Sequence, residues 1–212
     1  MLREFCAENL VNVREAIGAG AQRVELCGDL SVGGITPSDE VIEQAVNLVH
    51  GLGATVMVMV RPRGGDFAYS EPEVVRMENT IRRARDLGAD GVVFGCVRDG
   101  RLDEGATCRL VQTAKELDRT FHMAFDQIRP ELQATALEKL ARIGFSRVLT
   151  HGGRLELPIE TCMPHLHELV DVAARYNIAI MPGGGVTWQN AHEVCTELGV
   201  SEVHGTRICK MT

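Results

Sequence analysis

Two apolar runs of this sequence end in side chains that could bind a ligand or move a proton. The run VMVMVRPRGGDF, at 56–67, passes from valine and methionine to Arg61 and Arg63 beside two glycines. The run TFHMAFD carries His122 and Asp126. Arginine holds anions through a fixed fork of N–H donors, and histidine and carboxylates act as general acids and bases. These residues indicate a site for a small anionic molecule.

Carboxylates also occur in the first two apolar runs of the chain. MLREFCAE contains Glu8, and RVELC contains Glu25. If the fold brings Glu8 and Glu25 together, the pair could share a proton or bind a hard divalent cation. The sequence gives no distance between them, so the class of reaction stays open.

The composition excludes several kinds of partner. A formal charge of -7 and a pI near 5.5 argue against nucleic acid, which is bound through Lys/Arg surfaces. No apolar run is long enough to cross a membrane, and MLREFCAENL does not resemble a secretory signal. The seven cysteines are an odd number without a C-x-x-C pair, which predicts reduced thiols in a cytoplasmic protein. We expect a small-molecule or ion partner.

The pattern that must position these residues alternates between short strands and longer helical segments. Phrases such as ARDLGADGVVF and LARIGFSRVLT repeat one order of helix, glycine turn and strand. This predicts an α/β protein with a (β/α)8 TIM-type barrel in one domain over residues 1–212. A doubly wound sheet is less favoured, because no strand is followed by G-x-G-x-x-G. The predicted strands are 2–8, 23–27, 54–61, 91–96, 120–126, 147–151, 178–182 and 202–206.

The chain ends a few residues after the eighth predicted strand. The segment RICKMT is too short for an eighth outer helix, so we predict that this helix is missing. A strand without its helix leaves an apolar flank uncovered, which predicts association into a homo-oligomer.

Strand residues alternate between the barrel lumen and the helix layer, so parity assigns their faces. In the first two strands parity turns five residues to the lumen: Glu4, Cys6, Glu8, Glu25 and Cys27. In the third strand Val56, Val58 and Val60 face the helices, and Met57, Met59 and Arg61 face the lumen. In the fifth strand Phe121, Met123 and Phe125 face outward, and His122, Ala124 and Asp126 inward. Active sites of such barrels lie at the carboxyl ends of the strands. The predicted catalytic residues are Glu8, Glu25, Arg61, His122 and Asp126, with His204 as a further lumen candidate.

Two features of this site have alternative interpretations. The lumen charges could be a structural network in which Arg61 pairs with Glu8 or Glu25. The turn PGGGVTWQN places Gly183, Gly184 and Gly185 after the seventh strand, where many barrels bind phosphate, so we predict that these glycines join Arg61 and Arg63 in anion binding. The alternative is a tight turn with Thr187 as a helix cap.

Several phrases together resemble the CutC family, which is named for copper homeostasis and has a (β/α)8-type barrel. They are VELC, GGITPS, RPRGGDFAYS, FHMAFD, RVLTHGG, GGGV and EVHG, and they span nearly the whole chain. The resemblance implies a copper site at Cys6 and Cys27 in the first two strands. Thiolates suit Cu(I), and Met57 and Met59 could add soft sulfur nearby. These residues could instead be apolar filler between barrel layers.

The sequence therefore supports two functions. The first is a cytoplasmic copper homeostasis protein that binds Cu(I) at Cys6 and Cys27. The second is a barrel enzyme that acts on a small anionic, phosphorylated or hydroxy-acid metabolite by acid/base chemistry at the strand carboxyl ends.

Overall fold

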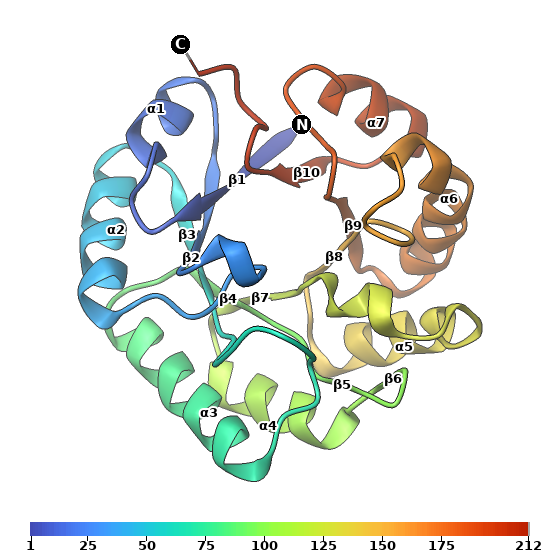
Figure 1. The fold of residues 1–212 in the computed structure, drawn as a ribbon, viewed down its shortest axis with the longest axis horizontal. Coiled ribbons are helices and arrows are strands. Elements are labelled where there is room, and N and C mark those ends of the chain that lie inside the picture. The colour runs from blue at the N-terminus through green and yellow to red at the C-terminus, as the bar shows by residue number, and fades with distance from the viewer. Residues whose placement is uncertain (212) are drawn as a thin grey trace.

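Eight parallel strands form the centre of the molecule (Figure 1). The computed structural model describes residues 1–211. The strands follow one another in the hydrogen-bonded order β10-β1-β2-β3-β4-β7-β8-β9, and a short hairpin of β5 and β6 lies outside them. This nearly closed barrel confirms the predicted fold class. The strands are β1 Leu2–Glu8, β2 Arg23–Cys27, β3 Thr55–Met59, β4 Gly91–Phe94, β5 Val97–Arg98, β6 Arg101–Leu102, β7 Asp118–Phe121, β8 Arg147–Thr150, β9 Ala179–Pro182 and β10 Glu202–Gly205.

Helices surround the barrel, and residues at the ends of several of them satisfy free backbone groups or favour the turn. Ser38 caps α2 by accepting a hydrogen bond from the amide of Val41, and Ser70 and Glu73 form a reciprocal capping box at α3. Gly144 ends α5 with φ of 101°. The helices are α1 Val13–Gly18, α2 Asp39–Gly51, α3 Glu71–Asp86, α4 Glu104–Ala114, α5 Pro130–Ile143, α6 Ile159–Tyr176 and α7 Ala191–Leu198, and the 3₁₀ helices are η1 Leu30–Val32 and η2 Met123–Gln127.

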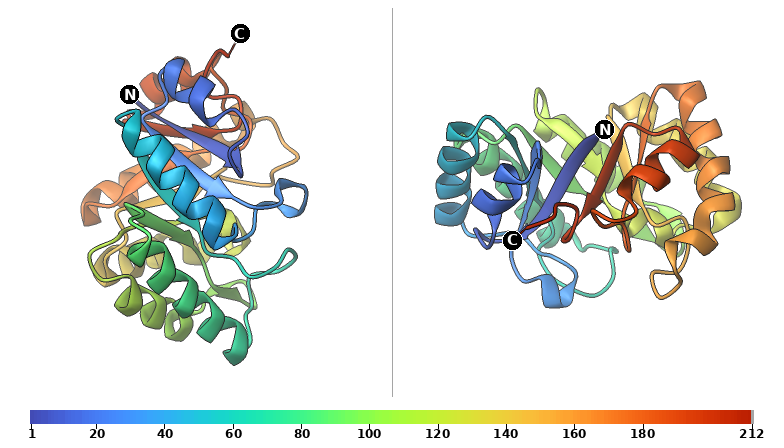
Figure 2. Two further views of the ribbon diagram at one scale, coloured as in Figure 1. Left: turned by 90° about the vertical axis from the view of Figure 1, so that its left-hand side faces the viewer. Right: turned by 90° about the horizontal axis from the view of Figure 1, so that it is seen from above.

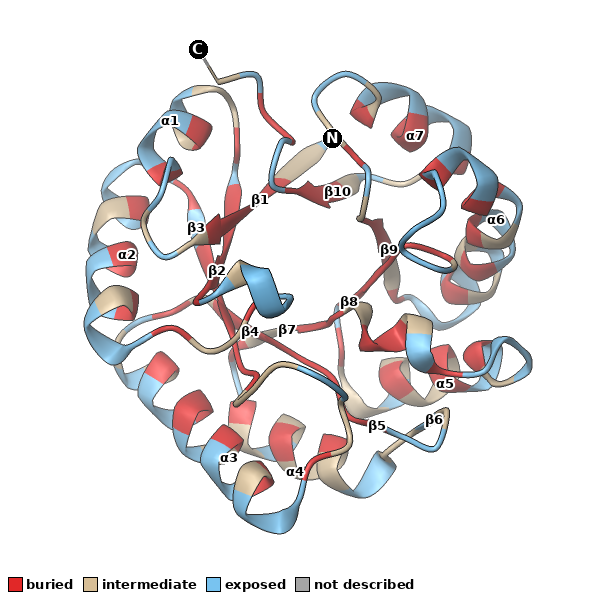
Figure 3. Cartoon of the chain, viewed as in Figure 1, coloured by how far each residue is buried: buried red, intermediate tan, exposed pale blue. Residues whose placement is uncertain are grey.

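Both faces of the strands are buried, which explains their continuous apolar runs (Figure 3). Val56, Val58 and Val60 pack in the outer core with the helices. Met57 and Met59 pack in a separate inner cluster with Cys6, Cys27 and Val93. Full burial of a valine side chain contributes about 1.5 kcal/mol or more relative to exposure. The parity prediction is confirmed for β1, β2 and β3.

Parity fails in the second half of the fifth predicted strand. The strand β7 ends at Phe121, and the chain turns into η2 directly after His122. Ala124 therefore packs in the outer core instead of the lumen, and Met123 lines a cavity instead of the helix layer. The reason is that alternation holds only while the backbone is extended.

The seam of the barrel lies between β9 and β10. Among the described residues no ladder joins these two strands, although both lie at the same gap in Figure 1. A single bridge between Thr187 and Arg207 links the segments that follow them, and the amide of Trp188 donates to the carbonyl of Arg207 at 2.8 Å. The barrel is thus closed by its loops at this point.

The segment after β10 confirms the missing eighth helix, because residues 206–211 contain no helix. The expected bare flank is wrong, however. Ile208 and Cys209 are buried in the same outer core as Val203 of β10. A short non-helical segment therefore contributes apolar side chains to the outer core after β10.

An ionic network that sequence reasoning missed fills the amino-terminal end of the lumen. The guanidinium of Arg23 pairs with the carboxylates of Glu4 and Glu202. Arg147 lies 3.1 Å from Glu202 and 2.7 Å from Asp118. We call these five residues the lower network. The sequence pattern that could have revealed this network is an arginine at the first position of two strands, Arg23 in RVEL and Arg147 in RVLT. Strand alternation turns both arginines towards the lumen.

Candidate functional site

Two thiols and a carboxylate converge at the carboxyl-terminal end of the lumen. Cys6 of β1 lies opposite Glu25 of β2 in the parallel ladder, and Cys27 is two residues further along β2. The sulfur atoms of Cys6 and Cys27 lie 3.3 Å and 3.5 Å from Oε2 of Glu25. One ligand atom from each of the three residues lies within 4.8 Å of the others, and all three are buried. The predicted metal pair is therefore brought together.

His204 of β10 extends this group across the barrel. Its Nδ1 lies 2.7 Å from Oε1 of Glu4, and its Nε2 lies 3.6 Å from Oε2 of Glu25. The pKa of Glu4 falls to about 2, because the His204 hydrogen bond and the charges of Arg23 and His204 outweigh its burial. The pKa of His204 rises well above its ordinary value, because Glu25 and Glu4 outweigh the cost of burying its charge. We call Cys6, Glu25, Cys27 and His204 the thiol–carboxylate cluster.

The two thiols of this cluster differ in acidity. The pKa of Cys6 lies well below its ordinary value, because Cys27 and His204 donate hydrogen bonds to its thiolate. The pKa of Cys27 is raised, because it supplies the proton to Cys6 and is buried. Burial raises the pKa of Glu25. Cys6 is therefore the thiol that ionises first.

A cavity of about 220 Å³ adjoins the cluster. It opens towards a second chamber of about 490 Å³, and Gly33, Arg61, Phe67 and Met123 line both. The loops that follow β2, β3 and β8 protrude together at this end of the barrel (Figure 2, right). The inner cavity is lined by Cys6, Glu25, Cys27, Leu30, Gly33, Met59, Arg61, Phe67, His122, Met123, Leu149, His204 and Thr206.

The ring of His122 forms one wall of the inner cavity in a defined protonation state. The amide of Ala124 donates to its Nδ1 at 3.2 Å, so the proton of the neutral ring lies on Nε2. Burial and the charge of Arg61 lower its pKa to about 3, so the ring is neutral at pH 7. Nε2 is buried and has no hydrogen-bond partner among the described residues. Gly95 leaves room for the ring, because a Cβ there would lie 2.8 Å from Nδ1.

Arg61 lies at the boundary of the two chambers and is only 4% exposed. Its guanidinium donates to the carbonyls of Val32, Gly33, Gly34 and Gly65 at 2.7–3.1 Å. It also lies over the ring of Phe67, 4.6 Å from the centroid.

Within residues 1–211 Arg61 has no carboxylate partner, so the alternative pairing with Glu8 or Glu25 is wrong. Its Nε is buried without a hydrogen-bond partner. The side chain holds two loops together and still carries an uncompensated charge.

Three other predicted site residues lie outside the inner cavity. Glu8 accepts a hydrogen bond from the amide of Leu30 at 2.7 Å and so anchors η1. Asp126 lines the outer chamber, bonds to Thr150 and to the amide of His151, and has a pKa raised by burial.

Arg63 points away from both chambers. It pairs with Glu73 at 2.6 Å and with Asp66 at 2.9 Å, so Asp66 supports Arg63 in the loop. The structure therefore does not bring Arg63 to Arg61, although both follow the same strand.

The glycine turn after β9 is occupied by its own protein contacts. The amide of Gly183 donates to Thr150, and the ring of His151 lies 2.8 Å from the carbonyl of Gly184. Asn190 is the cap residue of α7, and Thr187 instead accepts from the amide of Gln189. Phosphate binding at Gly183, Gly184 and Gly185 stays a prediction.

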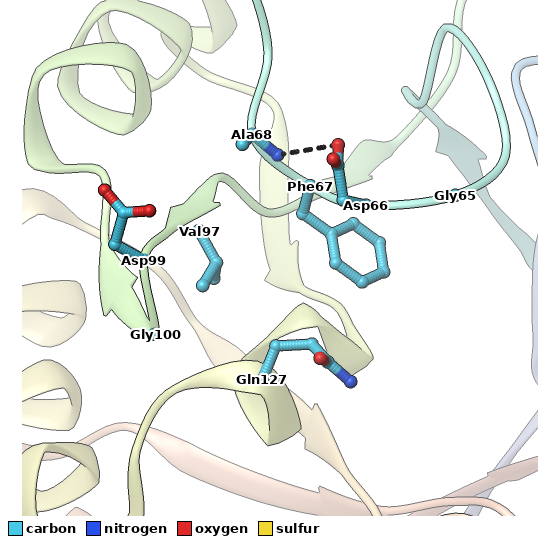
Figure 4. A pocket seen from close by; sticks show the side chains of 8 residues that line it. All are labelled: Gly65, Asp66, Phe67, Ala68, Val97, Asp99, Gly100 and Gln127. Atoms are coloured by element: carbon cyan, nitrogen blue, oxygen red, sulfur yellow. Dashed lines mark hydrogen bonds between the residues drawn. The ribbon is translucent and has the colours of Figure 1, made fainter.

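A further hollow of about 440 Å³ lies beside the outer chamber on the molecular surface. Phe67 lines this hollow as well as both chambers, and Gln127 lies across from it (Figure 4). Phe67 is therefore the partition between the lumen cavity and the surface. Sequence reasoning missed this role, although Phe67 closes the glycine-rich loop after β3.

The fold and this cavity define a (β/α)8 barrel protein with a buried site of thiols, carboxylates and histidine at the carboxyl ends of its strands. The chain belongs to the CutC family, whose model matches residues 1–209. No helix among the described residues combines the length and the apolar character that a membrane crossing requires.

Relatives match along almost the whole chain. A family protein CutC of Enterococcus faecalis is 46% identical over 98% of this chain and 100% of its own length. The mouse copper homeostasis protein cutC homolog is 40% identical over 96% of this chain and 72% of its own length. A CutC crystal structure from Streptococcus agalactiae superimposes with a TM-score of 0.94 at 43% identity, covering 98% of this chain and 99% of that chain.

Proposed function

We propose that this protein binds Cu(I) at Cys6 and Cys27 and so takes part in copper homeostasis in the cytoplasm. The observation that carries the proposal is the convergence of the two thiols on Oε2 of Glu25 inside the barrel. The name of the mouse relative, a copper homeostasis protein cutC homolog, supports the same role.

The donors fit a soft monovalent ion better than a hard divalent one. Cu(I) prefers thiolate and thioether sulfur, whereas Mg²⁺ and Ca²⁺ require shells of oxygen ligands. Met59 lines the same cavity as the two thiols, so a third sulfur is at hand. A single carboxylate, Glu25, is the only oxygen donor in the group with the two cysteines.

An unpaired atom of Glu25 also supports binding of a ligand at this point. Oε1 of Glu25 is buried and has no hydrogen-bond partner among residues 1–211. Leaving a buried polar atom unpaired costs about 1 to 3 kcal/mol. An ion next to Glu25 would remove this cost. Cys6 is already the more acidic thiol, which favours its role as first ligand.

The test is a Cu(I) titration against a competing chelator under anaerobic conditions. The wild-type protein should bind one equivalent of Cu(I). The double variant Cys6→Ser with Cys27→Ser should lose stoichiometric binding, because both thiolates are gone.

Cys108→Ser is the matched control, because it removes one thiol that lies on the outer helix α4. Its Cu(I) binding should equal that of the wild-type protein. Retention of one tight equivalent by the Cys6/Cys27 double variant would show that the copper site proposed here is wrong.

A further inference from the structure

Three residues that line the inner cavity each have one buried polar atom without a hydrogen-bond partner among residues 1–211. They are Nε2 of His122, Nε of Arg61 and Oε1 of Glu25. All three residues line the same space of about 220 Å³. Most buried polar atoms in folded proteins have a partner, so three orphans around one cavity indicate a missing ligand.

Two of the three atoms are hydrogen-bond donors of fixed identity. The proton of His122 lies on Nε2, because Nδ1 accepts from the amide of Ala124. The Nε of arginine always carries a proton. A ligand that satisfies both must therefore present acceptor atoms to His122 and Arg61.

The charge of the ligand follows from Arg61. This side chain is nearly fully buried, and within residues 1–211 the groups around its guanidinium are backbone carbonyls, the face of Phe67 and the neutral hydroxyl of Tyr69. A buried cation without a counter-ion is costly, so an anion is the complementary partner.

A carboxylate suits the site better than a phosphate. Two N–H groups without partners match the two oxygens of a carboxylate, whereas a phosphate requires more donors than these walls supply. The remaining walls are largely apolar and include Leu30, Met59, Phe67, Met123 and Leu149. The small volume restricts the ligand to a few carbon atoms.

The third orphan atom adds one further requirement. Glu25 also lines this cavity, and its carboxyl group can accept a hydrogen bond from a hydroxyl group or donate one to it. A hydroxyl group on the carbon next to the carboxylate would complete the set.

We propose that the inner cavity is a binding site for a small 2-hydroxycarboxylate, with the carboxylate held by Arg61 and His122 and the hydroxyl group by Glu25. The two proposals share Glu25, which both thiols contact, but Arg61 and His122 belong to this inference alone, so binding is measured on the metal-free protein.

The experiment measures binding of L-lactate to the metal-free protein by thermal shift and by NMR titration. Lactate should raise the melting temperature, and lactamide, which lacks the charge, should not. Propionate, which lacks the hydroxyl group, should bind about five-fold to ten-fold more weakly than lactate. Inorganic phosphate tests the choice of anion, and binding of phosphate more tightly than lactate would overturn the carboxylate assignment.

Variants of the two donors locate the site. His122→Phe keeps the ring packing against Phe67 and Phe121 and removes the N–H donor. It should weaken lactate binding about ten-fold or more, and Arg61→Lys should do the same. Arg63→Met is the matched control, because it removes one positive charge from the same loop outside the cavity, and its lactate affinity should equal that of the wild-type protein.

Two results would overturn the proposal. One is that the wild-type protein binds neither lactate nor propionate when each is present at about 50 mM. A site with a dissociation constant of about 1 mM would be almost fully occupied at that concentration. The other is a His122→Phe variant that folds and binds lactate as tightly as the wild-type protein.

Discussion

The two ends of the barrel lumen contain similar residue types in opposite states. At the amino-terminal end Arg23 and Arg147 each contact two carboxylates, so the lower network is internally paired. At the carboxyl-terminal end Arg61, His122 and Glu25 each retain a buried atom without a partner. The lumen therefore carries a completed set of charges at one end and an incomplete set at the other.

The difference follows from what each end must do. Buried charges are tolerated where every member of the group is paired, and removal of one partner is then costly. A site for a ligand needs groups that the protein itself does not satisfy. We therefore expect the lower network to stabilise the barrel and the upper end to bind the proposed ligands. Measurements of stability and of binding at each end test this division.

The largest expected effect is on stability at the lower network. Arg23→Met removes the partner that Glu4 and Glu202 share, and leaves Glu4 with His204 alone and Glu202 with Arg147 alone. We expect the free energy of unfolding to fall by about 3 to 5 kcal/mol, measured by urea denaturation. A decrease of less than about 1 kcal/mol would contradict the proposal that the lower network stabilises the barrel.

At the upper end, we expect His122 to make the free energy of unfolding depend on pH by a similar amount. Its pKa is about 3 in the folded protein and near 6.5 in the unfolded chain, so the unfolded state binds the proton first as the pH falls. Stability should decrease from about pH 6.5 downwards, on the order of 3 kcal/mol by pH 4. His122→Phe should flatten this part of the stability–pH curve. An NMR titration that protonates the ring near pH 6.5 would contradict the expected burial.

Asp118 should give a smaller effect of the same kind. Partial burial raises the pKa of Asp118, but the Ser146 hydroxyl and Arg147 outweigh this effect and lower it. Its contribution is present above the unfolded pKa and is lost as the pH falls through the folded value. Asp118→Asn should reduce the free energy of unfolding at pH 7 by about 1 to 2 kcal/mol. Equal stability of variant and wild type at pH 7 would place Asp118 outside the network.

The smallest effect on stability should come from the two thiols. Cys6→Ser with Cys27→Ser replaces two small buried side chains by near-isosteres, so the free energy of unfolding should change by about 1 kcal/mol or less. The same variant should lose Cu(I) binding. A loss of several kcal/mol in urea denaturation would mean that the cluster belongs with the lower network.

The sequence predicted the barrel and its eight strands, because those features follow from hydrophobic periodicity and glycine turns. Parity placed Cys6, Glu25 and Cys27 on one face correctly, because β1 and β2 are extended throughout. It failed at Met123 and Ala124, because nothing in FHMAFD distinguishes a strand from a strand that turns into η2.

The partners of Arg61 could not be read from the sequence. Its location at a strand end was correct, but it bonds to the backbone of Val32, Gly33 and Gly34, about 30 positions earlier in the chain. Every residue has a backbone carbonyl, so the sequence does not indicate which carbonyls accept hydrogen bonds from a charged side chain. Such a side chain therefore has no identifiable partner when only the sequence is known. The separation of Arg63 from Arg61 depends likewise on the path of a glycine-containing loop.

The unpaired edges of β9 and β10 set the order in which the barrel loosens. Amides that face the seam lack a ladder partner in the described part of the chain, and the tail at Ile208 and Cys209 has no helical hydrogen bonds to hold it. Segments with few internal hydrogen bonds open at the lowest free energy. In deuterium exchange, the tail and the seam should therefore exchange before β1, β2 and β3, so that breathing motions expose the side of the barrel next to His204 first.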